Sequence, residues 1–240
     1  MTSLFLIPFL ILAAVSAWFL VPYAWRYVEE RRMARACRAA KVIVLSYDDG
    51  PGPQTTPQLL KLLADRGICA TFFPLGSNAK TRPELAARMI AQGHEVGSHT
   101  FDHTNAWKTG PRSAAQDRDR GIAHVSGIGG EGRLFRPPYG KLTLVGLVAA
   151  WRRGLRLAWW TIDSRDSWQR RSAGEVLANI DAAGGGVVLM HDADTYERSG
   201  SGHPDYVVDL TRCIIDHAQA NGYHLIRLGD LLEPGGKERD

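Results

Sequence analysis

The sequence predicts an α/β protein with about seven parallel strands, preceded by one transmembrane helix at the amino terminus. Three observations support this prediction. From residue 41 onward, short apolar runs alternate with helical patterns, and such alternation is typical of a parallel sheet, closed or open. The first 25 residues carry no charged side chain. Histidines and carboxylates follow directly after several of the apolar runs.

Composition narrows the class of protein. The 240 residues suffice for one domain with a proper core plus an anchor, and 45% hydrophobic with 22% charged residues is typical of a globular chain. The net charge of +4 is modest and no zinc-finger or RNA-binding signature occurs, so we expect no nucleic-acid partner. Cys37, Cys69 and Cys213 match no metal or redox motif. The sequence gives no indication of the oligomeric state.

Residues 1–25 are predicted to form a transmembrane anchor. Leu4 to Val21 is almost continuously apolar, and about 20 such residues span a bilayer as a helix. Trp18, Tyr23 and Trp25 lie near its end, and aromatic side chains favour the membrane interface. A cleaved signal peptide ending near Val15-Ser16-Ala17 is the alternative, although the positive charge that normally opens such a peptide is absent.

Residues 26–40 are predicted to form a basic linker helix, and residues 41–240 the main domain. The basic residues after the apolar run are Arg26, Arg31, Arg32, Arg35, Arg38 and Lys41. By the positive-inside rule they place the main domain in the cytoplasm; it would be extracytoplasmic if the segment acts as a signal peptide or signal anchor. At helical spacing the arginines could also lie along anionic lipid headgroups, or face solvent in a short linker.

The main domain is predicted to contain about seven β/α units. The expected strands are Val42–Leu45, Cys69–Leu75, His94–Ser98, Leu134–Phe135, Leu157–Ile162, Val187–Met190 and Tyr223–Arg227. The expected helices are Pro57–Arg66, Pro83–Gln92, Ser113–Val125, Leu142–Arg153, Ala173–Ala183 and Tyr206–Ala220. Gly200 to Pro204 is expected to be a flexible loop.

Polar residues of catalytic type follow these strands where each strand ends. They are Asp48 and Asp49, His99 and His103, Arg136 to Gly140, Asp163 and Asp166, and His191. Barrels and open parallel sheets build their sites at the carboxyl ends of their strands. Because scattered core residues would not be expected to share one rim, this placement predicts a functional site.

Asp49, His99 and His103 are predicted to hold one divalent cation. The two histidines are four residues apart, so one helical turn would place both imidazoles on the same face. Two histidines and one carboxylate leave an open position for water, and Asp48 is expected to be the base that activates it. Zn²⁺ fits these ligands best, with Co²⁺, Ni²⁺ or Mn²⁺ also possible. Alone, the Asp-Asp-Gly run fits an acidic turn and the histidine pair a surface feature, so the prediction depends on their combination.

Two more segments contribute to the predicted site. Arg136-Pro137-Pro138-Tyr139-Gly140 is stiff because its two prolines fix the backbone and remove donors, which leaves the Tyr139 N–H as a natural free donor. The alternative is a rigid loop with a structural arginine. The buried run Val187–Met190 ends on His191, which is either a core histidine or, at this rim, a well-placed acid.

Five motifs in this order resemble those of the polysaccharide deacetylase family, the NodB-type carbohydrate esterases, over about Lys41 to Leu232. The similar segments are Ser46–Gly50, His99–His103, Arg136–Gly140, Asp163–Trp168 and Leu189–His191. The resemblance implies a distorted (β/α) barrel that removes an N-acyl group, usually acetyl, from an amino sugar. The implied roles are metal binding by Asp49, His99 and His103, general base for Asp48 held by Arg136, an oxyanion contact from the Tyr139 N–H, general acid for His191, and substrate contact by Leu189.

The fourth motif departs from the family pattern, in which a tryptophan directly follows the aspartate. Here Ser167 separates Asp166 from Trp168. By the resemblance, Asp166 orients and charges His191, and Trp168 walls the sugar groove. The inserted serine predicts a groove of different shape at Trp168.

Three functions stay open at this point. The first is an N-deacetylase of an acetylated amino-sugar glycan. The second is a deacylase of a lipid-linked sugar at the cytoplasmic membrane face, with the membrane contacted through the amino-terminal helix. The third is a catalytically silent sugar-binding protein of the same fold. The presence of both an acid and a base argues against the third, since a binding module needs neither.

Overall fold

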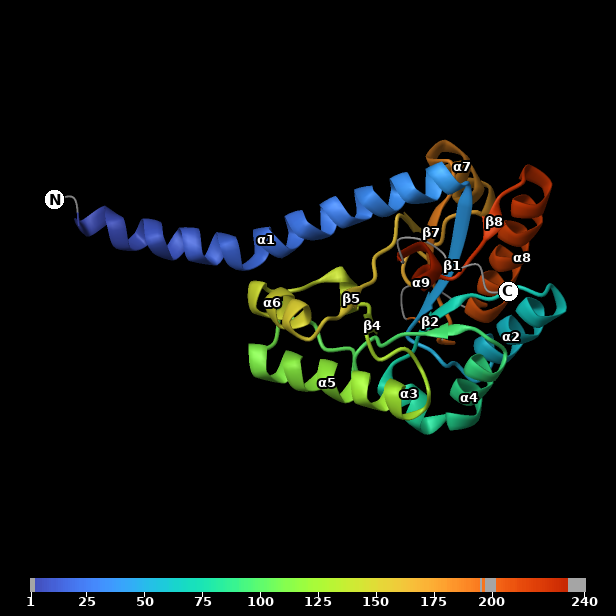
Figure 1. Ribbon diagram of the computed structural model, residues 1–240, viewed down its shortest axis with the longest axis horizontal. Coiled ribbons are helices and arrows are strands. Elements are labelled where there is room, and N and C mark those ends of the chain that lie inside the picture. Colours follow the sequence, from blue (N-terminus) through green and yellow to red (C-terminus); the bar gives the residue numbers. More distant parts are fainter. Residues whose placement is uncertain (1–2, 195, 197–201, 233–240) are drawn as a thin grey trace.

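The computed structural model describes residues 3–194, 196 and 202–232, and within the first helix the side chains of residues 3–7 and 9–14 lie outside that description. Its main sheet has six parallel strands in the order β3-β2-β1-β7-β6, with β8 also pairing with β1, and β4 and β5 form a second parallel pair (Figure 1). The strands are β1 Val42–Asp48, β2 Thr71–Phe73, β3 Glu95–Val96, β4 Leu134–Phe135, β5 Arg156–Leu157, β6 Ile162–Asp163, β7 Gly186–His191 and β8 His224–Leu225.

The two sheets together form an incomplete barrel. A parallel bridge between Ser98 and Phe135 joins the β3 side of the main sheet to β4. Among the described residues no strand pairing joins β5 to β6. The predicted single strand Leu157–Ile162 is therefore wrong. The chain leaves one sheet at Ala158, whose N–H bonds to Phe135, and joins the other at Thr161, whose N–H bonds to Val187.

The helices cover the sheets on the outside. They are α1 Ser3–Ala40, α2 Thr55–Asp65, α3 Gly76–Thr81, α4 Pro83–Ala91, α5 Pro111–Gly127, α6 Leu144–Arg152, α7 Ala173–Ala183, α8 His203–Asn221 and α9 Leu228–Leu232, with a 3₁₀ turn at Pro138–Gly140. The six predicted helices of the main domain are confirmed as elements, and α3 and α9 were not predicted. The predicted loop 200–204 lies partly outside the described residues, but His203 and Pro204 begin α8.

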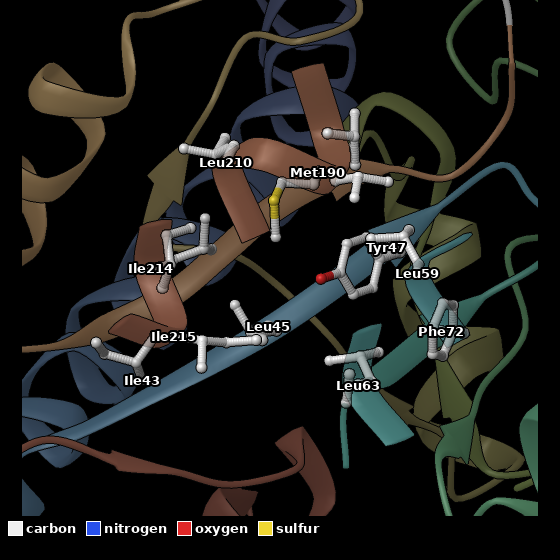
Figure 2. Packing of buried hydrophobic residues seen from close by; sticks show 14 of the residues in the cluster. Ile43, Leu45, Tyr47, Leu59, Leu63, Phe72, Met190, Leu210, Ile214 and Ile215 are labelled. Carbon is white, nitrogen blue, oxygen red and sulfur yellow. The ribbon is translucent and has the colours of Figure 1, made fainter. Parts of the chain in front are cut away.

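Strand β1 divides the core in two. All seven of its residues are buried, as expected of a central parallel strand covered on both faces. Ile43, Leu45 and Tyr47 point into a cluster with α2 and α8, which Figure 2 shows from close by. Val42 and Val44 point the other way, into a cluster that also contains side chains of α1. This alternation fixes the strand register and hence the position of Asp48 at its end.

Helix α1 is one continuous helix of 38 residues. Met33 and Cys37, one turn apart, are buried in the second core cluster, so the segment predicted as a linker packs against the main domain. The amino-terminal part projects away from the rest of the fold (Figure 1). In the described part of the chain, no helix has an apolar stretch of the length needed to cross a membrane. The predicted anchor over residues 1–25 lies partly outside the described residues, and the described part does not confirm it.

Candidate active site

One cavity of about 790 Å³ opens at the carboxyl ends of the strands. The register places Asp48 beside both Phe73 of β2 and His191 of β7. The side chains that line the cavity are Asp48, Asp49, His99, His103, Tyr139, Lys141, Trp160, Asp163, Ser167, Trp168, Leu189, His191 and Tyr196. Residues that follow β1, β3, β4, β6 and β7 meet here, as the predicted rim requires, although Arg136 and Asp166 are buried and do not line the cavity.

Asp49, His99 and His103 form a cluster suited to a metal ion. One ligand atom from each lies within 4.8 Å of the others. Asp49 Oδ1 is 3.5 Å from His99 Nε2 and 3.3 Å from His103 Nε2. That oxygen is buried and has no hydrogen-bond partner among the described residues. Since a buried carboxylate oxygen without a partner is costly, these residues fit a divalent cation bound between them.

The two histidines do not share a helical turn, so that part of the prediction is wrong. Both lie in the loop after β3, where Thr100 and His103 adopt left-handed backbone conformations with φ of 70° and 58°. Asp117 of α5 holds this loop by accepting the N–H groups of Phe101 and Asp102 at 3.1 and 2.7 Å. The loop, rather than helical periodicity, brings the imidazoles to one side.

The environment of His99 keeps its imidazole neutral. Its Nδ1 lies 2.7 Å from the carbonyl oxygen of Arg136, which fixes the ring so that Nε2 faces Asp49. Burial lowers the pKa of His99 to about 3. A neutral imidazole is the form that ligates metal ions.

Asp48 is held by a fully buried arginine. Arg136 Nη1 donates to Asp48 Oδ1 at 2.7 Å and to Ser46 Oγ at 3.0 Å. Its Nη2 donates to the Trp159 carbonyl at 3.2 Å, and the guanidinium lies 4.1 Å from the centre of the Phe73 ring. Burial raises the pKa of Asp48 and the charge of Arg136 opposes that rise. The pair fixes the carboxylate beside the metal ligands.

On the other side of the cavity, His191 is paired with buried Asp166. Its Nδ1 lies 2.7 Å from Asp166 Oδ1, and its backbone N–H donates to Oδ2, also at 2.7 Å. Burial alone would lower the pKa of His191, but the charge and hydrogen bond of Asp166 raise it to about 10. His191 therefore holds a proton at neutral pH. His203, not predicted, supports this pair by placing Nε2 3.1 Å from the His191 carbonyl.

Tyr139 occupies a strained turn at the cavity rim. Its φ of 58° and ψ of 10° are left-handed, a conformation that is costly for a residue with a side chain. Its ring lies 4.5 Å from that of His103 and is half-exposed. Among the described residues no acceptor takes the Tyr139 N–H, in keeping with the prediction of a free donor.

Leu189 and Trp168 both reach the cavity. Leu189 is buried in its floor, whereas Trp168 is 45% exposed. The Arg165 guanidinium lies 4.9 Å from the centre of the Trp168 ring. The inserted Ser167 also lines the cavity, so the insertion does not remove Trp168 from the site.

Among the site residues that the sequence did not predict, Tyr196 makes the most direct contact with a predicted metal ligand. Its hydroxyl donates to Asp49 Oδ2 at 2.8 Å, and its ring lies 5.2 Å from that of His191. It follows β7, in a polar stretch without hydrophobic periodicity that gives no signal in the sequence. Trp160 was likewise assigned only to a strand.

The comparisons with known proteins agree with this geometry. A family model described as polysaccharide deacetylase matches residues 35–157, about half of the chain. The chain belongs to the polysaccharide deacetylase family. The resemblance based on the five motifs is thereby confirmed, together with the prediction of a hydrolase of this family.

Known deacetylases are similar to this chain in both sequence and fold. A chitooligosaccharide deacetylase of Sinorhizobium fredii is 35% identical over 167 residues, which cover 68% of this chain and 77% of that protein. A peptidoglycan-N-acetylglucosamine deacetylase of Bacillus cereus is 29% identical over 222 residues, covering 91% and 77%. The crystal structure of the Bc1960 peptidoglycan N-acetylglucosamine deacetylase superposes with a TM-score of 0.71 at 27% identity, covering 81% of this chain and 89% of that one.

Proposed function

We propose that this chain is a metal-dependent hydrolase that removes an N-acetyl group, or another small acyl group such as formyl, from an amino sugar of a glycan. The observation that carries this proposal is the arrangement around one cavity. The unpartnered Asp49 oxygen lies between two imidazoles, the Asp48 carboxylate lies beside them, and a protonated His191 also faces the cavity. Amide hydrolysis needs a base for water and an acid for the leaving amine.

Asp49 and the Nε2 atoms of His99 and His103 would hold the cation. Zn²⁺ suits two imidazoles and one carboxylate, and Co²⁺, Ni²⁺ or Mn²⁺ can take the same ligands. When bound, such an ion polarises the amide carbonyl and makes water more acidic. Tyr196 fixes the outer oxygen of Asp49 and so orients the carboxylate.

Asp48 and His191 each carry out one of the two proton transfers. Asp48 accepts a proton from the attacking water, and Arg136 keeps the carboxylate aimed at that position. The Tyr139 N–H donates to the oxyanion that forms on the amide carbon; loss of one such donor typically costs about 3 kcal/mol of barrier. His191 then gives its proton to the departing amine. Trp168 and Leu189 contact the sugar.

A release assay tests the proposed function. Acetate and formate are measured after incubation with chitooligosaccharides, peptidoglycan fragments and lipid-linked amino sugars, each with and without a chelator. We expect release from at least one class, loss of release with the chelator and recovery when Zn²⁺ is added back. Chelator-insensitive release would contradict the metal site, and no release from any class would contradict the activity.

A catalytically silent sugar-binding protein is the alternative on the same fold. It would bind glycans without releasing acetate or formate. The Asp166–His191 pair argues against it, because binding a sugar does not require a general acid. Measurable glycan affinity with no turnover in the same preparation would favour this alternative.

For location, we propose a single-pass membrane protein whose catalytic domain faces lipid-linked or nearby glycan substrates. The uncharged first 25 residues support this. Exposed apolar side chains continue along α1 at Val15, Leu20 and Val21. The charge rule favours the cytoplasmic side. A reporter fused to the carboxyl terminus that is active only in the periplasm would rule out that orientation.

A further inference from the structure

Arg26 of helix α1 contacts the turn that carries Tyr139. Its Nη1 donates to the carbonyl oxygen of Gly140 at 2.9 Å, across 114 residues of sequence. Its guanidinium lies 4.4 Å from the centre of the Trp160 ring, and its Nε donates to Glu30 at 2.6 Å. The side chain is only 20% exposed. All three interactions depend on the planar fork of a guanidinium, which an ammonium cannot reproduce together.

The turn that Arg26 contacts is strained and needs support. Tyr139 and Gly140 are consecutive left-handed residues, with φ of 58° and 62°. Within the turn, Gly140 N–H donates to Pro137 and Lys141 N–H donates to Pro138, at 2.9 and 3.0 Å. Conformations of this kind persist only where the surroundings over-determine them. Arg26 adds a charged hydrogen bond from outside the turn, and such bonds are stronger than neutral ones.

Gly140 also leaves no free space on the side of Arg26. A Cβ atom built on Gly140 would overlap the Arg26 guanidinium and the Trp160 ring. The three residues are therefore packed tightly together, and Trp160, which contacts Arg26, also lines the cavity. A shift of α1 along its axis would move the Gly140 carbonyl or break its bond.

The rest of α1 keeps Arg26 in place. Glu30, Met33 and Cys37 follow at spacings of four, three and four residues, which places them on one helical face. Met33 and Cys37 are 4% and 0% exposed in the core. The family model begins only at residue 35, so Arg26 precedes the matched region.

We infer that Arg26 is a positioning residue for the proposed deacylation: it locks the Gly140 carbonyl and thereby aims the Tyr139 N–H at the oxyanion. This inference rests on the proposed function, which gives the Tyr139 N–H its task. By this inference, helix α1 contributes a residue that supports catalysis. An effect on the oxyanion contact appears in kcat rather than in KM.

Steady-state kinetics of the full-length chain test the inference with three variants. R26A should lower kcat about tenfold with KM unchanged, as loss of one charged hydrogen bond predicts. R26K, which keeps a charged donor, should recover part of the loss. R32A is the matched control: Arg32 lies on the same helix, 63% exposed, and pairs with Glu29 at 2.7 Å. It should behave as wild type.

Amide hydrogen exchange provides a readout that does not depend on turnover. Exchange over residues 137–143 should accelerate in R26A and stay unchanged in R32A, with equal melting temperatures for R32A and wild type. Unchanged kcat and unchanged exchange in R26A would overturn the inference, as would a fall in melting temperature with kcat intact. If the wild-type chain releases no acyl group, the proposed function fails by itself, and the exchange data still decide whether Arg26 holds the turn.

Discussion

His99 is buried and His191 is partly buried in the same cavity, yet one imidazole is neutral and the other is cationic. The Nδ1 of His99 faces a backbone carbonyl at 2.7 Å, and burial lowers its pKa to about 3. The Nδ1 of His191 faces the Asp166 carboxylate at the same distance, and that charge raises its pKa to about 10. The partner of the second ring nitrogen decides whether a buried imidazole binds a cation or stores a proton.

The difference divides the site into two halves. The half with His99 combines a neutral imidazole with the Asp49 carboxylate and suits a cation. The half with His191 is cationic, and its proton can be donated to the departing amine. Four substitutions test this division, taken from the largest expected effect to the smallest.

Asp48→Asn should have the largest effect. The amide cannot take a proton from water, so kcat should fall about 10²–10⁴-fold, while bound metal measured by mass spectrometry stays at the wild-type level. Asp102→Asn is the control, because Asp102 lies in the same loop as His103 but pairs with exposed Arg120 at 2.9 Å. Normal turnover by Asp48→Asn would refute its role as base.

Arg136→Met should destabilise the fold. It leaves the buried Asp48 carboxylate without its partner, and breaking a buried pair in this way costs about 3–5 kcal/mol. Arg120→Ala removes a pair whose side chains are 57% and 52% exposed, where the expected cost is about 0–1 kcal/mol. Urea unfolding of both variants measures the two costs, and equal costs would contradict the importance of burial.

Asp166→Asn should abolish the charge difference between the two histidines. In the wild type the raised pKa of His191, about 10, means that the native state keeps a proton that the unfolded chain loses near pH ~6.5. The resulting stabilisation is full below that lower value and disappears as the pH rises through 10.

In Asp166→Asn the alkaline limb of the kcat profile should move from near 10 toward ~6.5 or below. The pH–rate profile and the His191 resonances in NMR titrations measure this shift. Asp163→Asn, a half-buried neighbour that lines the same cavity, should leave the limb in place. An unmoved limb in Asp166→Asn would show that another group is the acid.

Trp168→Ala should have the smallest effect. Loss of a ring contact worth ~1 kcal/mol would raise KM about fivefold with little change in kcat. Trp151 is the matched control, since it is 48% exposed against 45% for Trp168 but does not line the cavity. If both variants have the wild-type KM, Ser167 has displaced the substrate from this wall.

Much of the site could be predicted from local sequence because strand ends are easy to recognise. The buried run before Asp48 and the run before His191 set both residues at the rim, and parallel strands place all such ends at one edge. Tyr196 and His203 could not be predicted in this way. They reach the site from a polar stretch and from the first residue of α8, where no periodicity fixes direction.

The sequence by itself determined the parallel α/β plan, the family and the side chains of the metal cluster, because these depend on short patterns and residue chemistry. Only the tertiary structure decided how His99 and His103 converge, since a loop held by Asp117 replaces the expected helical turn. It also decided the charges of His99 and His191 and brought Arg26 onto the Gly140 carbonyl. Contacts across a hundred residues depend on packing, and no local pattern records them.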